Sequence, residues 1–586
     1  MARAMQGEKM KGGGRKAKNA MQTFKRLMDY LFERYKKRFI LVCILIVFSA
    51  AISIAGSVFI GFFTQHLSDI MENAVAAAKT AAESEGLVWT EEMAKAVTGS
   101  LDVGFFGLLA GLIAVYVFGI ICNFTYSRLM MFIAQGTMKR LRDDMFSHMQ
   151  SLPLQFYDSR THGELMSSFT NDTDTLRQLL GQTIPQLISS VVTIVGVFFA
   201  MLFYSVTLTL VALVFIFLLL VVVGKITGKS SVFFIKQQAS LAAVNGYIEE
   251  MMAGQKVVKV FNHEQKSIEG FDSLNEELRQ NATSANTFIN VMAPFTNNLG
   301  YVEYIVIALL GVFLAAVGGV WGLSLFGVTQ GTGGALTLAA IIAYISLVRS
   351  FNMPVQQVAQ QFNTVVMGMA GAERIFAILD AESEDEGGNI TLVRVEEKDG
   401  NYVESENGNY WAWKIPADDE NGAVRYERLR GDIRFEDVTF GYTEEKVILH
   451  NISLYARPGQ KIAFVGSTGA GKTTITNLIN RFYDIQSGKI TYDGLDIRSI
   501  RKSDLRRSLG VVLQDTHLFT GTVMDNIRYG RLNATDEECI AAAKLANADF
   551  FIRHLPDGYN TLLEGDGGNL SQGQRQLLAI ARAMGS

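Results

Sequence analysis

The chain has 586 residues, more than one globular core usually holds, so two or more domains are expected. Its 53 Lys and Arg nearly balance 57 Asp and Glu, and a net charge of −4 gives no reason to expect nucleic-acid binding. Charged residues make up only 19% and the mean hydropathy is +0.20, which excludes a disordered or wholly soluble protein. The three cysteines are far apart and the seven histidines lack ligand spacing, which argues against a disulfide framework and a structural zinc site.

Long charge-free runs predict six membrane-spanning helices. Residues 39–65 and 103–127 are each long enough for one crossing. Residues 178–224 are too long for one helix and predict two, joined by a tight turn near Tyr204. Residues 304–348 are interrupted by a glycine-rich stretch and predict two more. A buried soluble core seldom contains charge-free runs of this length, which favours the membrane interpretation.

The distribution of Lys and Arg predicts the orientation. Residues 1–38 carry twelve of these cations, whereas residues 66–102 carry only Lys79 and Lys95. The positive-inside rule therefore places both termini in the cytoplasm. Apolar and basic side chains alternate at helical spacing over residues 22–37, which predicts an amphipathic helix on the inner membrane surface before the first span.

Two polar segments, residues 128–177 and 225–290, separate the predicted spans. Apolar residues recur in both at helical spacing, so we expect the spans to continue as helices well past the membrane. Disordered loops are the disfavoured alternative.

The composition becomes acidic over residues 381–430. Two strand-like runs, Thr391–Val395 and Tyr410–Ile415, allow a small hairpin there. The favoured interpretation is nevertheless a solvated linker without chemistry.

A phosphate-binding motif follows. The pattern is strand-like after Asp432, and Lys461–Val465 predicts an apolar strand that leads into G-x-x-x-x-G-K-T and a helix. The motif and the residue after it are Gly466, Ser467, Thr468, Gly469, Ala470, Gly471, Lys472, Thr473 and Thr474. Glycines let backbone N–H groups curl around a phosphate chain, and the helix N-terminus adds its positive end. Lys472 would reach the β- and γ-phosphates and Thr473 would bind Mg²⁺, so the domain is predicted to bind a nucleoside triphosphate; an accidental glycine-rich turn is the alternative.

The sequence Leu570-Ser571-Gln572-Gly573-Gln574 resembles the signature of ATP-binding cassette exporters, in which six membrane helices and a nucleotide-binding domain share one chain. The resemblance runs from about residue 22 to the end, apart from the 381–430 insertion. It implies a multi-domain fold, with an all-α six-helix transmembrane domain fused to an α/β P-loop domain. The implied N-terminal segment, transmembrane domain, acidic linker and ATP-binding domain are residues 1–37, 38–380, 381–430 and 431–586.

The resemblance also implies residue roles. Tyr442 would stack on adenine, and Gln514 would contact Mg²⁺ and the attacking water; a strand-end tyrosine and a surface glutamine are the plain alternatives. Residues 564–568 match an acidic, glycine-rich loop that touches the membrane domain in such exporters. Residues 156–158 resemble a coupling helix, and residues 249–254 resemble the corresponding inner loop.

By the same resemblance, two chains associate and sandwich two ATP molecules between the phosphate loop of one and the signature of the other. Ser571, Gln572, Gly573 and Gln574 would contact nucleotide, with ATP and Mg²⁺ as cofactors. Gln572 replaces the usual glycine, which favours a heterodimer over a homodimer. The chain would be an integral protein of a bacterial plasma membrane, in contact with lipid.

The implied function is ATP-driven export of a small amphipathic molecule, lipid or peptide. The alternative is a degenerate or regulatory half in which ATP gates conformation without efficient hydrolysis. The sequence stops at Ser586, before the segment where the family carries a metal-binding Asp, the catalytic Glu and the switch His. We therefore expect a truncated chain that binds nucleotide without turning it over.

Glu303 is the one acid within the fifth predicted span. An ionisable group at that depth is expected to face a water-filled cavity rather than lipid. It would either help to bind cationic substrates or cap or pair with a neighbouring helix.

Overall fold

The computed structural model describes residues 20–85, 106–317, 337–398, 400–416, 424–443, 446–513 and 516–585. The chain divides into two compact units. The first, helical unit comprises residues 1–150 and 163–381, and the second, mixed unit comprises residues 151–162 and 382–586.

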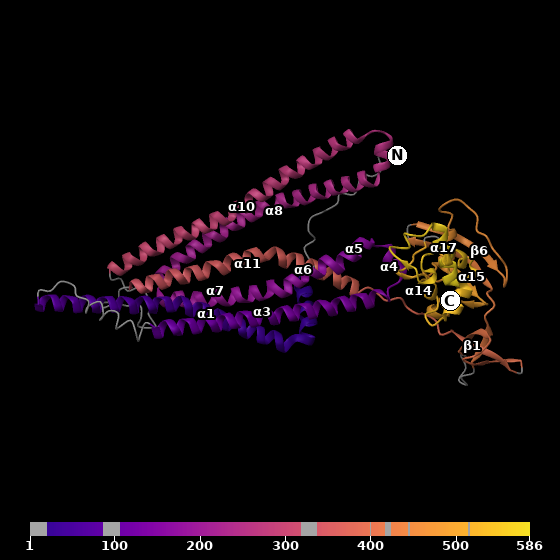
Figure 1. The fold of residues 1–586 in the computed structure, drawn as a ribbon, viewed down its shortest axis with the longest axis horizontal. Coiled ribbons are helices and arrows are strands. Elements are labelled where there is room, and N and C mark those ends of the chain that lie inside the picture. The colour runs from indigo at the N-terminus through magenta and orange to yellow at the C-terminus, as the bar shows by residue number, and fades with distance from the viewer. Residues whose placement is uncertain are drawn as a thin grey trace. The chain divides into compact units, whose positions relative to one another are not determined.

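Within its described residues, the helical unit has six helical segments that are long and apolar enough to cross a membrane, as predicted (Figure 1). Its elements, with two π-helical turns η2 and η3, are α1 (Ala20–Glu85), α3 (Phe106–Met149), α5 (His162–Ser167), η2 (Ser168–Asp172), α6 (Thr173–Gln178), η3 (Leu179–Thr183), α7 (Ile184–Tyr204), α8 (Val206–Ala253), α9 (Gln255–Val260), α10 (Glu264–Val317) and α11 (Leu338–Leu379). The glycine-rich turn predicted between the last two spans lies outside the described residues.

The tight turn expected near Tyr204 is confirmed. Helix α7 ends at Tyr204, and Ser205 adopts an extended conformation before α8 begins at Val206. The Ser205 Oγ accepts a hydrogen bond from the Leu208 N–H at 3.3 Å, so this serine caps the new helix.

The long helical extensions are also confirmed. Helices α8 and α10 lie side by side over much of their length (Figure 1). Polar contacts join them beyond the apolar stretches: the Asn281 Nδ2 donates to Ser240 Oγ at 2.8 Å, and the Tyr247 hydroxyl donates to the Ser267 carbonyl at 2.9 Å.

Residues 22–37 are helical as predicted, but they form the first part of α1 rather than a separate surface helix. From Ala20, where α1 begins, the sequence has no glycine or proline before Gly56, so nothing ends the helix ahead of the span. Leu27 and Leu31 are fully buried. The Arg26 guanidinium binds the Asp380 carboxylate at the end of α11, with N···O distances of 2.5 and 2.6 Å.

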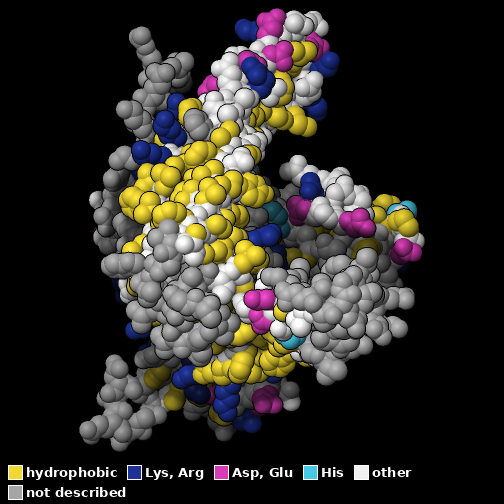
Figure 2. All heavy atoms as spheres, turned by 90° about the vertical axis from the view of Figure 1, so that its left-hand side faces the viewer, with side chains coloured by type: hydrophobic (Ala, Val, Ile, Leu, Met, Phe, Trp, Pro, Cys, Tyr) yellow, Lys and Arg dark blue, Asp and Glu magenta, His cyan; other side chains and the backbone are white. Residues whose placement is uncertain are grey.

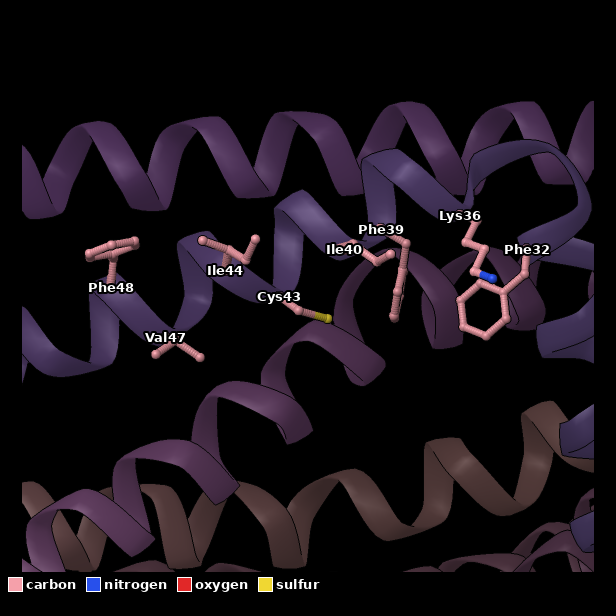
Figure 3. A pocket seen from close by; sticks show the side chains of 8 residues that line it. All are labelled: Phe32, Lys36, Phe39, Ile40, Cys43, Ile44, Val47 and Phe48. Atoms are coloured by element: carbon pink, nitrogen blue, oxygen red, sulfur yellow. The ribbon is translucent and has the colours of Figure 1, made fainter.

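Hydrophobic side chains cover much of the outer surface of the helical unit (Figure 2). On α7 and α8, for example, Phe199, Val214 and Phe217 are exposed, while Val197 and Leu208 are fully buried. One open apolar groove of about 450 Å³ runs along α1 between Phe32 and Phe48 (Figure 3). A surface of this kind is suited to lipid rather than to water.

The described part of the mixed unit forms three sheets with strand orders β2-β1-β3-β4, β6-β5-β7-β8 and β10-β9. The strands are β1 (Thr391–Lys398), β2 (Asn401–Glu404), β3 (Tyr410–Ile415), β4 (Arg425–Arg428), β5 (Ile433–Thr443), β6 (Lys446–Ala456), β7 (Ser487–Tyr492), β8 (Leu495–Asp496), β9 (Gly521–Thr522) and β10 (Leu562–Leu563). The helices, with the 3₁₀ turn η4, are α4 (Leu154–Asp158), α12 (Lys472–Ile479), α13 (Lys502–Arg507), α14 (Val523–Arg528), α15 (Asp536–Leu545), α16 (Asp549–Arg553), η4 (Gly558–Asn560) and α17 (Gln572–Gly585).

The interpretation of residues 381–430 as a solvated linker is wrong, and the hairpin is confirmed. Strands β1 and β3 pair antiparallel, with Leu392 opposite Trp413, and β2 and β4 extend the pair to four strands. Leu392 and Trp413 are buried in one core with Phe435 and Tyr492 of the neighbouring sheet. The average composition of residues 381–430 is acidic because it includes the loops. The buried face comes only from alternating residues of the strands, so the average does not reveal it.

Candidate functional site

The phosphate-loop motif connects β6 to α12. All residues from Lys461 to Ala470 are exposed, and Gly469 and Gly471 adopt left-handed conformations with φ of +89° and +83°. The side chain that Gly471 lacks would meet Leu449 at 2.6 Å, so this position needs glycine.

The strand predicted over Lys461–Val465 is not present. A strand exists through hydrogen bonds to a neighbour, and this segment pairs with no other strand in the described part of the chain. Val465 is 94% exposed. The segment is apolar, but apolar composition alone does not make a strand, which also needs a neighbouring strand to pair with.

Lys472 is the first residue of α12 and its ammonium group lies against the loop. Nζ donates to the carbonyls of Gly466 and Ser467, both at 2.8 Å. The next side chain, Thr473, is exposed, and Thr474 is buried.

These residues fit a magnesium nucleotide. A cation held at the mouth of an exposed, glycine-rich loop, next to a helix N-terminus, supplies the charge and the backbone donors that a phosphate chain requires. Thr473 would offer its hydroxyl to the metal, and Lys472 would exchange carbonyl contacts for phosphate oxygens.

Tyr442 lies at the end of β5 beside the same helix. Its hydroxyl is 3.3 Å from the Thr474 Oγ1 and accepts a hydrogen bond from Asn477 Nδ2 at 3.4 Å. Its ring packs edge-on against Phe440 and Tyr483, with centroid distances of 5.1 and 5.0 Å. The structure thus brings Tyr442 to the phosphate-loop helix, and stacking on adenine stays a prediction.

The signature residues form the start of α17. The Ser571 Oγ accepts a hydrogen bond from the Gln574 N–H at 3.3 Å, while the Gln574 Oε1 accepts one from the Ser571 N–H at 2.9 Å. This reciprocal pair is a capping box. Gln572 and Gly573 are exposed between its two members. Among the described residues, no hydrogen bond or ion pair joins Ser571–Gln574 to the phosphate loop.

Gln514 lies outside the described residues, but the segment that follows it is fixed at two points. The Leu518 N–H donates to the Asp566 carboxylate at 2.8 Å, and this hydrogen bond lowers the pKa of that carboxyl group. Arg582 of α17 donates to the carbonyls of His517 and Asn526 at 3.1 and 2.9 Å. The predicted acidic loop and the signature helix therefore both hold the chain after Gln514.

The predicted coupling-helix region forms α4 within the mixed unit. The Tyr483 hydroxyl donates a hydrogen bond to the Asp158 carboxylate at the end of α4. Burial, together with this hydrogen bond, raises the pKa of Tyr483. Beside α4, a cleft of about 330 Å³ is lined by Pro153, Gln155 and Tyr442. Tyr483 therefore contacts both α4 and Tyr442, a link that the sequence did not predict.

Glu303 is 2% exposed, and its Oε2 accepts a hydrogen bond from Asn352 Nδ2 at 2.7 Å. Asn352 lies on α11, so this contact supports the second of the two predicted roles, pairing with a neighbouring helix. An open cavity of about 660 Å³ adjoins the pair; Asn352 and Arg349 line it, whereas Glu303 does not. Sequence reasoning missed Arg349, which directly follows the charge-free run 304–348.

Six membrane-spanning candidates and a P-loop domain in one chain define a membrane protein that binds nucleotide. Comparison with known families agrees. Residues 39–321 match the model of the ABC transporter transmembrane region, and residues 449–586 match that of the ABC transporter.

Several relatives match most of the chain. The uncharacterized ABC transporter ATP-binding protein YfiC of Bacillus subtilis is 35% identical over 97% of this chain and 81% of its own. The fatty acid ABC transporter ATP-binding/permease protein of Mycobacterium tuberculosis is 36% identical over 81% of this chain and 67% of its own. The ATP-dependent lipid A-core flippase of Syntrophus aciditrophicus is 29% identical over 79% of this chain and 69% of its own. The chain belongs to the ABC transporter family and is an exporter-type half-transporter, an integral membrane protein with an ATP-binding domain.

Proposed function

We propose that this chain forms half of a dimeric exporter that uses ATP to move an amphipathic, lipid-like molecule across the bacterial plasma membrane. The observation that carries the proposal is the joining, in one chain, of an open cavity between membrane-spanning helices and a phosphate loop whose Lys472 lies ready for an anion. Relatives named for a fatty acid and for lipid A support a lipid-like cargo over a peptide.

The proposed nucleotide is ATP with Mg²⁺, held by Lys472 and Thr473 and completed by Ser571 and Gly573 of a second half-transporter. Backbone N–H groups at the start of α17 would face the γ-phosphate. ATP closure would then alternate the membrane cavity between its two openings, with both termini on the cytoplasmic side.

Reconstituted liposomes test this proposal directly. Purified protein should move a fluorescent phospholipid between leaflets only when Mg-ATP is supplied on the side of the nucleotide domain. Lys472→Ala should reduce this movement to the level of protein-free liposomes. Equal movement with and without ATP would contradict an ATP-driven exporter.

A regulatory half is the second candidate, favoured by Gln572 in place of a glycine in the signature. Such a chain would bind ATP with negligible hydrolysis and would depend on a different, catalytic partner. Phosphate release separates the two functions: comparable turnover by the chain alone and by its complex with a partner would contradict the regulatory role.

A further inference from the structure

The cavity beside Glu303 has a chemical character that bears on the cargo. It measures about 660 Å³, within the size range of sites that hold small molecules. Helices α10 and α11 contribute most of its lining, and Ile60 of α1 also lines it. Ile342, Ile345 and Met353 supply apolar surface, while Asn297 and Gln356 supply amides. The lining therefore offers both hydrocarbon surface and polar groups.

Arg349 is the one charged side chain in this lining, within the part of the chain that the structure describes. It is exposed and lines the cavity, and among the described residues it makes no hydrogen bond or ion pair. A guanidinium group stays protonated, and within a membrane span such a cation is costly unless an anion or water meets it.

Glu303 does not neutralise Arg349. Its carboxylate is 2% exposed and bound to Asn352, and no ion pair joins it to Arg349 among the described side chains. The carboxyl group is thus buried between α10 and α11, and the positive charge of Arg349 lines the cavity. This arrangement disfavours a cationic ligand.

We propose that this cavity binds an amphiphile with an anionic headgroup, a carboxylate or a phosphate, and that Arg349 is its headgroup contact. The planar guanidinium fork matches both oxyanions, and the apolar lining residues match the hydrocarbon chain. The assignment rests on the proposed function only for the claim that the bound molecule is the exported one.

Binding without nucleotide tests the assignment. Purified protein on scintillation-proximity beads is titrated with radiolabelled dodecyl phosphate, dodecanoate, dodecyltrimethylammonium and dodecanol, which share a chain and differ in headgroup. The variants are Arg349→Gln, Arg349→Lys as the charge-conserving rescue, and Arg279→Gln as a control that removes an arginine paired with Glu276 outside the cavity. Thermal unfolding of each variant establishes that it folds.

The wild type should bind one or both anions more tightly than the cation and the alcohol, and the preferred anion identifies the headgroup. Arg349→Gln should weaken anion binding about tenfold and leave the alcohol unchanged, because a charged hydrogen bond is lost. Arg349→Lys should recover most of the loss, and Arg279→Gln should resemble the wild type.

Equal binding of all four amphiphiles by the wild type would overturn the assignment, and this result does not depend on any variant folding. Anion binding that survives Arg349→Gln would also overturn it. Anion-selective binding by a protein that shows no ATP-dependent transport would instead reject the proposed function and leave the cavity assignment in place.

Discussion

The indole Nε1 of Trp413 donates a hydrogen bond to the Asp493 carboxylate at 3.1 Å, which ties the four-stranded insertion to the sheet beside the phosphate loop. The other Asp493 oxygen accepts hydrogen bonds from the backbone N–H groups of Gly431 and Asp432, both at 2.9 Å. One carboxylate therefore fixes the end of the insertion and the start of β5 together. The insertion is part of the ATP-binding unit's core rather than a spacer.

Replacing Trp413 should destabilise this unit strongly. The side chain is fully buried, so Trp413→Ala removes its packing and leaves a cavity, at a cost of about 3–5 kcal/mol in unfolding free energy. Trp411, on the same strand but only half-buried, is the matched control, and its alanine variant should lose clearly less. Denaturant unfolding followed by tryptophan fluorescence compares the two. Equal losses would mean that the insertion does not share the core.

The ion pairs of Glu384 should make the stability of the mixed unit depend on pH. Arg506 donates to its carboxylate at 2.6 and 2.8 Å, and Lys502 lies at 3.5 Å. Burial opposes ionisation, but the Arg506 and Lys502 contacts prevail and lower the pKa of Glu384. A lowered folded-state pKa gives stability that is fully present above the unfolded-state value and is lost as the pH falls through the folded-state value.

Glu384→Gln should therefore lower the unfolding free energy by about 1 kcal/mol at pH 7. Below the folded-state pKa, where the wild-type carboxyl is protonated, the difference should disappear. The measurement is the unfolding free energy from pH 7 down to pH 3, with exposed Glu382→Gln as the control. A difference that grows toward acid would have the wrong sign for this account.

The capping box of α17 makes a separate prediction. Ser571→Ala removes the side-chain acceptor for the Gln574 N–H and should destabilise the nucleotide-free unit by about 1 kcal/mol. Ser571→Thr keeps an acceptor at the same place and should lose less. Hydrogen exchange of the amides in the first turn of α17 measures the loss of the cap directly. Identical exchange in the two variants would show that the serine does not cap the helix.

Local patterns predicted the helices and the phosphate-loop motif well, because both depend on residues that are close together in the sequence. The turn at Ser205 was predicted from a short break between two apolar runs. Lys472 was assigned to the motif from its fixed spacing to the preceding glycines. The hairpin at β1 and β3 was visible as two strand-like runs, but its burial was not. That burial depends on Trp413 meeting Asp493 from a distant part of the chain.

Arg349 was missed for the same reason, and the sequence left two roles open for Glu303. An acidic residue within an apolar run suggests a functional site, so Glu303 was singled out from the sequence. Only the packing of α10 against α11 gives Glu303 its partner in Asn352 and leaves Arg349 to line the cavity. Which face of a helix meets a neighbour is a tertiary property that spacing alone does not determine.

The central claim is that the loop around Lys472 holds the nucleotide that drives this exporter. Equilibrium binding of a fluorescent ATP analogue in the presence of Mg²⁺ tests it, with wild type, Lys472→Ala and the exposed Lys489→Ala on β7 as the control. Losing the charged contacts should weaken binding by about a hundredfold in Lys472→Ala and leave Lys489→Ala unchanged. Nucleotide affinity that is the same in all three proteins would contradict the account.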